Sequence, residues 1–283
     1  MGVMERGKNN FSQSLFENQR SYNFYFYKLL ELSISMFEWV NLPESVDARF
    51  IETCLFDNGC AVWFYDDVMG NLCLRCAIGA PLNVYDIPTN RRAYANNGFS
   101  RQLNQNDSVI VYNNLLHLPS HNDILMFANR LWNLDRIIDV NANAQKTPLI
   151  IQCDETQRLT LLNLYKKYDG NAPIIFADKS LKLDDFKCVK TDAPYIADKI
   201  YSLKKNIWNE ALTSLGISNF DMEKKEHLIT DEISVEMGDI MSARFSRLAA
   251  RKQACEKINN MFGLNIDCRY RGKEVVDNEQ IYN

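Results

Sequence analysis

Two long amphipathic segments that flank a β-rich insert constrain this chain more than any other feature. The first runs from about residue 122 to 140 and the second from about 191 to 215. In each segment apolar residues recur at spacings of three and four, which is typical of a helix with one buried face. At 1.5 Å per residue, each helix would be about 30 Å long. We therefore expect a helical hairpin that carries the insert at its tip.

The second of these helices has signals at both ends. It opens with Thr191-Asp192-Ala193-Pro194, a capping residue followed by proline in the first turn, and it is expected to stop at Gly216. The insert is expected to hold three strands and a short helix. The strands lie over 148–153, 172–177 and 186–190, and the helix over 159–168. Because the insert is too small for a good core of its own, neighbouring subunits are expected to complete it.

The segments on either side of this hairpin differ in character. An aromatic-rich helix is expected over residues 11–40, ended by Pro43. Short apolar runs separated by dense turn signals over 59–112 indicate a small antiparallel sheet or barrel. The predicted fold class is therefore α+β, mainly α.

The last third of the chain begins with an acidic stretch over 221–241, expected to be a surface loop. A final helix is expected from the capping residue Ser242 to Gly263. Its first turns place three arginines on one face. These are Arg244, Arg247 and Arg251.

Composition excludes several classes of protein. The 283 residues are 46% apolar, which is enough for a core and too much for a disordered chain. The longest charge-free stretch, 108–122, is too short and too polar to span a membrane. The N-terminus has no apolar segment typical of a signal peptide, so we expect a reducing cytoplasm and eight free thiols. The net charge of −4 implies that any contact with DNA is loose or local.

Motifs for catalysis are missing from the sequence. It has no phosphate-binding loop, no dinucleotide fingerprint and only three histidines, so we do not expect an enzyme, a catalytic residue or a cofactor. Cys73 and Cys76 have the spacing of a zinc knuckle, and His117 and His121 could complete a tetrahedral site. We interpret these cysteines as buried, unreactive thiols, so no metal is expected. A zinc-dependent nucleic-acid-binding protein stays open as an alternative.

Long strings of residues, in the same order over nearly the whole chain, resemble the portal protein of small short-tailed phages of the phi-twenty-nine type. That family is also called the head–tail connector or upper collar. The strings include 143–148 (NAQKTP), 168–177 (YDGNAPIIFA), 190–195 (KTDAPY), 208–210 (WNE), 223–226 (EKKE) and 254–259 (ACEKIN). Near the N-terminus, Phe37-Glu38-Trp39 and Asn41-Leu42-Pro43 also fit.

The resemblance implies a twelve-subunit ring at one capsid vertex, with a central channel for packaging and ejection of double-stranded DNA. It divides the chain into a wing, a stem, a clip, a channel loop and a crown. These are wing 1–120, stem helix 121–144, clip 145–190, stem helix 191–217, channel loop 218–243, wing helix 244–263 and a short crown 264–283. The implied partners are the capsid and scaffolding proteins, a packaging ATPase with or without a packaging RNA, and the lower collar or tail, with no membrane. Assembly would take place in the host cytoplasm. The alternative to a portal among phage proteins is a ring-forming tail adaptor.

The resemblance also implies two groups of functional residues. The DNA channel would be contacted by Lys190, Lys199, Lys224 and Lys225. The acidic channel loop would include Asp231, Glu232, Glu236 and Asp239. Two features depart from the family pattern: the N-terminus lacks a dense basic cluster, and the tail after Gly272 is short.

Overall fold

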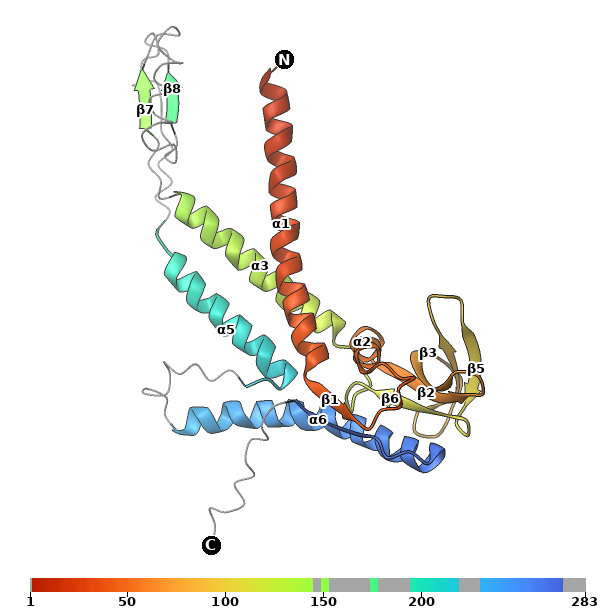
Figure 1. Ribbon diagram of the computed structural model, residues 1–283. Helices are drawn as coiled ribbons and strands as arrows, with labels where there is room; N and C mark the ends of the chain where they lie inside the picture. The colour runs from red at the N-terminus through yellow and green to blue at the C-terminus, as the bar shows by residue number, and fades with distance from the viewer. Residues whose placement is uncertain (1, 145–148, 153–173, 178–193, 219–229, 272–283) are drawn as a thin grey trace. The chain divides into compact units, whose positions relative to one another are not determined.

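The computed structural model of the chain describes residues 2–144, 149–152, 174–177, 194–218 and 230–271 (Figure 1). Five α-helices and nine β-strands lie in these ranges. They belong to two compact units, Met1–Leu131 with Ile207–Asn283, and Trp132–Asn206. The mixed α and β class predicted from the sequence is confirmed. None of the helices in the described ranges is long and apolar enough to cross a membrane.

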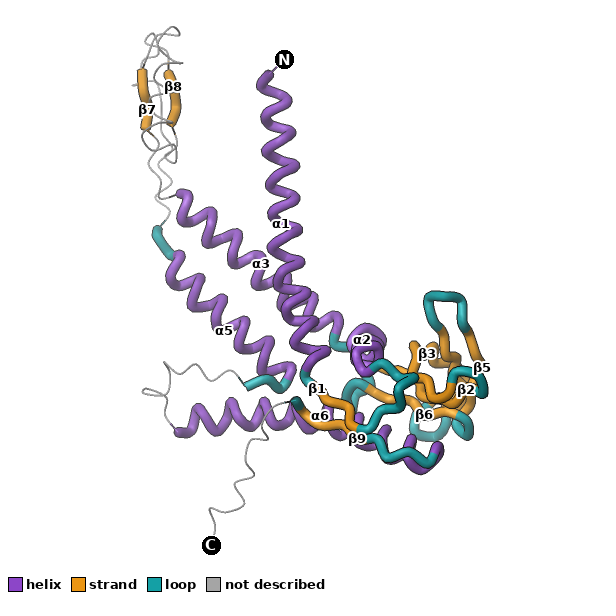
Figure 2. Tube along the Cα trace, viewed as in Figure 1, coloured by secondary structure: helices purple, strands orange, loops and turns teal. Residues whose placement is uncertain are grey.

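The N-terminal helix is shorter at its C-terminal end than predicted. Helix α1 covers Gly2–Ser35, and strand β1, Phe37–Val40, follows it directly. This strand pairs antiparallel with β9, Asp267–Tyr270, so that Phe37 lies opposite Tyr270 (Figure 2). The prediction of helix through residue 40 was wrong because the partner strand that holds these residues extended is far away in the sequence.

Helix α2, Ala48–Asn58, was not predicted, although its ends follow ordinary rules. The Asp47 carboxylate caps it by accepting hydrogen bonds from the amides of Arg49 and Phe50. The helix ends at Gly59, whose φ of 75° is left-handed. A Cβ at Gly59 would lie 2.8 Å from the His117 carbonyl oxygen, so glycine is also required by the close approach of another segment.

A five-stranded antiparallel sheet follows, as predicted for residues 59–112. Its strands are β2 (Cys60–Asp66), β3 (Gly70–Leu82), β4 (Pro88–Tyr94), β5 (Ser100–Asn104) and β6 (Ser108–Tyr112), in the order β5-β4-β3-β2-β6. One face holds a buried apolar cluster that includes Val62, Phe64 and Ile110. The opposite face packs against α2, and Trp63, on this side, is fully buried.

The two long helices flanking the insert are present and pair antiparallel. Helix α3 covers His121–Ala144 and helix α5 covers Ala197–Leu215. Arg130 pairs with Glu210 within the first unit. Asp135 pairs with Lys204 within the second. Since residue numbers rise along α3 as they fall along α5, the predicted helical hairpin is confirmed.

Helix α5 begins six residues later than predicted, at Ala197. Asn141 of α3 holds the preceding segment, because its Nδ2 donates to the Pro194 carbonyl and its Oδ1 accepts from the Ile196 amide, both at 3.0 Å. Proline at 194 therefore precedes the helix and does not lie in its first turn. The C-terminus ends at Gly216 as predicted, where the Ile217 amide donates to the Leu212 carbonyl at 2.9 Å.

Within the insert, strands β7 (Leu149–Gln152) and β8 (Ile174–Ala177) pair in parallel, which confirms two of the three predicted strands. The predicted helix over 159–168 and strand over 186–190 lie outside the described residues.

The last helix, α6, covers Thr230–Phe262 and so begins twelve residues before the predicted Ser242. The segment 230–241 was expected to be a loop because it is acidic. It contains no proline and several good helix formers, and local charge did not outweigh those preferences. The helix stops at Gly263, with φ of 65°, as predicted.

Candidate functional site

The three arginines that the sequence places on one face of α6 point into the protein. Arg251 is fully buried and donates from Nη2 and Nε to the two carboxylate oxygens of Glu52 in α2, at 2.7 and 2.9 Å. Trp39 Nε1 donates to the same carboxylate at 2.9 Å. Burial is the largest single influence and lowers the pKa of Arg251, but the charge and the hydrogen bond of Glu52, with smaller contributions from Cys268 and Tyr270, together outweigh it and the net shift is upward. The pair is a buried, bidentate salt bridge between α2 and α6.

Arg247 and Arg244 bind the C-terminal end of α5. Arg247 donates to the Ser120 hydroxyl at 2.8 Å and to the Ser214 carbonyl at 3.4 Å, and burial lowers its pKa. Arg244 Nε donates to the Gly216 carbonyl at 2.6 Å. Carbonyl groups at the end of a helix lack partners within it and carry partial negative charge. The arginines of α6 therefore fix the end of α5.

Helix α5 carries a row of exposed polar side chains that includes a cation. Lys199, Ser202 and Asn206 are all exposed and follow one another along the same side of the helix. Lys204 differs from Lys199, because it pairs with Asp135 of α3. Lys199 is the one residue of the predicted DNA-channel group that the structure describes. Lys190, Lys224 and Lys225 lie outside the described residues.

Of the predicted acidic group, Asp239 is exposed on α6 in the first unit. Asp231, Glu232 and Glu236 belong to the same helix, and their side chains lie outside the described part of the chain. All four therefore lie on a helix and not on the predicted loop. Lys199 belongs to the second unit, so the structure does not bring the two predicted groups together within one unit.

The four residues of the zinc alternative do not form a site. Cys73 and Cys76 lie three apart on β3 and so face opposite sides of the sheet. Cys76 hydrogen-bonds with Cys60, which together with burial raises its pKa, whereas burial alone is the main cause that raises the pKa of Cys73. A zinc ligand must be a thiolate.

The two histidines of that alternative have other partners: His117 stacks on Tyr112 with ring centroids 3.5 Å apart, and His121 lies 3.3 Å from Asp57. Among the described residues, no group of three or more histidine, cysteine or acidic side chains could hold a metal ion. Zinc binding at these four residues therefore has no support in the fold.

Comparison with known proteins finds a similar solved structure and a matching family. The chain is similar to a chain in the structure of the portal and tail of native bacteriophage P68, with a TM-score of 0.51 and 15% identity over 95% of this chain and 92% of that chain. The fold is therefore one found in a phage portal-and-tail assembly. The family model described as Phage Connector (GP10) matches residues 4–276, and the chain belongs to that family. Its role is that of a phage portal, or head–tail connector.

Proposed function

We propose that this chain forms a twelve-subunit ring at one vertex of a phage capsid and that double-stranded DNA enters and leaves through the channel of the ring. The observation that carries the proposal is the family match over residues 4–276. The antiparallel pair α3 and α5, with the strands β7 and β8 between them in the sequence, supports the assignment of a stem and a clip. A ring built this way has equivalent faces on every subunit, so one side chain is repeated around the channel.

In this ring the exposed side of α5 would face DNA, and Lys199 would contribute one positive charge per subunit. Twelve chains with a net charge of −4 each give a total charge of about −48. The negative field of this charge disfavours tight adhesion of DNA. The lysines, including Lys190, would then be weak and evenly spaced phosphate contacts that salt readily screens. Such contacts allow DNA to slide. The chain would hydrolyse nothing itself, since a separate packaging ATPase bound at the clip would drive the DNA.

The acidic start of α6 would act after packaging by opposing the return of DNA through the channel. Deleting residues 229–241 is expected to leave ring assembly and packaging intact while packaged genomes leak, as measured by the fraction of full particles after storage. The deletion is well placed because Ser242 can then cap the shortened helix. The matched control keeps the helix length and neutralises Asp231, Glu232, Glu236 and Asp239. Full particles in both variants would refute this role.

Electron microscopy of purified protein, with top views classified by symmetry, tests the proposed ring. Twelve copies of the 32.8 kDa chain should give a ring of about 390 kDa with a central hole. Labelling of virions then separates a portal inside the vertex from a tail adaptor below it. A chain that stays monomeric even with capsid and scaffolding proteins present would contradict the proposal.

A further inference from the structure

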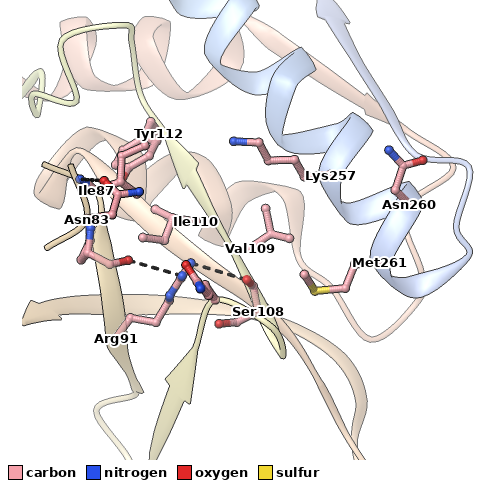
Figure 3. Close-up of a pocket in the computed structure, with 12 residues that line it drawn as sticks. Asn83, Ile87, Arg91, Ser108, Val109, Ile110, Tyr112, Lys257, Asn260 and Met261 are labelled. Carbon is pink, nitrogen blue, oxygen red and sulfur yellow. Dashed lines mark hydrogen bonds between the residues drawn. The ribbon is translucent and has the colours of Figure 1, made fainter. Parts of the chain in front are cut away.

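A pocket of about 520 Å³ lies in the first unit between the five-stranded sheet and the last turns of α6 (Figure 3). The sheet side is formed by β4, β6 and the loop before β4, and includes Arg91, Val109 and Ile110. Lys257 and Met261 line the opposite side from α6. The walls are therefore largely apolar, with a cation on each side.

Arg91 is buried in the wall of this pocket with too few partners. Its side chain is only 6% exposed, and its Nε atom is buried with no hydrogen-bond acceptor. The two terminal nitrogens make long bonds, of 3.5 Å to the Ser108 carbonyl and 3.4 Å to the Pro88 carbonyl. None of the salt bridges among the described residues includes it, although the Asp107 carboxylate is near enough to favour its charged form. Arg251, which is also buried, has a bidentate carboxylate, so Arg91 is the exception that requires an explanation.

Burial lowers the pKa of Arg91, and the nearby Asp107 carboxylate offsets this only in part, so the cation lacks a close anionic partner. Tyr112 lines the same pocket, and burial raises its pKa to about 12, so that its hydroxyl keeps its proton and can donate a hydrogen bond. Arg91, Lys257 and Tyr112 are all donors, and two of them are positive. The missing partner is therefore an anion.

The size and lining of the pocket narrow the class of anion. A bare inorganic ion would leave most of about 520 Å³ and the apolar wall formed by Ile87, Val109 and Met261 unfilled. The phosphates of duplex DNA are fixed to a rigid rod and cannot enter a pocket to reach a residue that is only 6% exposed. A carboxyl group carried on an apolar body matches both the donors and the wall.

We propose that this pocket binds an organic carboxylate, which pairs with Arg91 and Lys257 while its apolar part packs against Ile87, Val109 and Met261. Binding would replace the two long bonds of Arg91 with short, charge-assisted ones. A free organic acid and an acidic side chain of a neighbouring copy carry the same group. The inference does not depend on the proposed ring.

The test uses the full, unassembled chain and calorimetric titration with 3-phenylpropionate, with its neutral amide as the matched probe. The carboxylate should bind at least about tenfold more tightly than the amide, and Arg91→Met should remove that preference. Arg92→Met is the control, because Arg92 is the neighbouring, exposed residue on the same strand. Equal binding of acid and amide, or an Arg91→Met variant that keeps the preference, would overturn the proposal. If Arg91→Met does not fold, Lys257→Met on the rim should weaken the acid and not the amide.

The assembled oligomer separates the two sources of the carboxylate. If the occupant is a free acid, assembled protein should bind 3-phenylpropionate as the single chain does. If the occupant is an acidic side chain of a neighbouring copy, the assembled protein should exclude the probe, and Arg91→Met should slow assembly while Arg92→Met does not.

Discussion

Two sets of cations on successive helices are used in opposite ways. The arginines of α6 are turned inward, where Arg251 pairs with Glu52 and Arg247 binds the Ser120 hydroxyl. Lys199 on α5 is exposed to solvent. A planar guanidinium with several donors can satisfy many buried acceptors at once, whereas an ammonium on a long, flexible chain keeps its hydration and moves. Charge sign alone therefore does not separate the cations that hold the fold together from the exposed ones, whereas burial does.

The largest effect on stability is expected from removing the anion of the buried pair between Glu52 and Arg251. Glu52→Gln leaves Arg251 buried without its counter-charge, and we expect a loss of about 3–5 kcal/mol in the free energy of unfolding. Chemical denaturation measures this value. The control is Glu210→Gln, which removes the same group from the exposed pair with Arg130 and should cost less than about 1 kcal/mol. Equal losses in the two variants would show that burial does not distinguish the pairs.

A smaller effect is expected where Arg244 holds the end of α5. Gly216→Ala puts a side chain on a residue with φ of 78° and within 2.8 Å of Arg244 Cγ, so we expect a loss of about 1–3 kcal/mol. Gly238→Ala, inside α6 with open space around it, should instead gain about 0.5–1 kcal/mol. Thermal and chemical denaturation of both variants test the difference in sign. A stabilising Gly216→Ala would mean that the arginine contact does not fix this helix end.

The smallest effect on stability is expected for the exposed cation. Lys199→Ala should leave the free energy of unfolding unchanged, and it should leave packaging nearly unchanged because Lys190 remains. DNA binding should depend less steeply on salt. The slope of log K against log salt concentration should fall by about 0.9 for each phosphate that is no longer neutralised. Binding titrations of the ring over a range of salt concentrations measure this slope. Lys204→Ala is the matched control, because Lys204 is held by Asp135 and its removal should leave the slope unchanged. A complete block of packaging by Lys199→Ala would show that this lysine is more than a weak contact.

Local pattern was enough to predict the parts of the fold that depend on nearby residues. The antiparallel sheet within residues 59–112, helix α3, strands β7 and β8 and the stops at Gly216 and Gly263 all follow from periodicity and turn residues. Two of the errors occur where a distant partner decides. Residues 37–40 are a strand because β9 pairs with them, and α5 starts late because Asn141 holds the residues before it.

The same limit applies to the candidate site. Periodicity put Arg244, Arg247 and Arg251 on one face, but it could not show that this face is buried, because the partners Glu52 and Asn113 come from distant segments. For Arg91 the sequence held only a weak indication of burial. It lies two positions before Ala93 on the same strand, so the two side chains share one face, and Ala93 belongs to the core. The assignment of Lys190, Lys199, Lys224 and Lys225 to a DNA channel rests on the family resemblance and remains a prediction.

The pairing of β1 with β9 has a consequence for biosynthesis. Phe37 and Trp39 are buried in a strand whose partner is among the last described residues of the chain. Because the ribosome makes the chain from its N-terminus, β1 has no partner until residue 270 has been translated. A fragment that stops before Asp267 keeps an open strand edge with apolar side chains and cannot complete the first unit. Chains truncated before β9 therefore expose an edge that can pair with other chains.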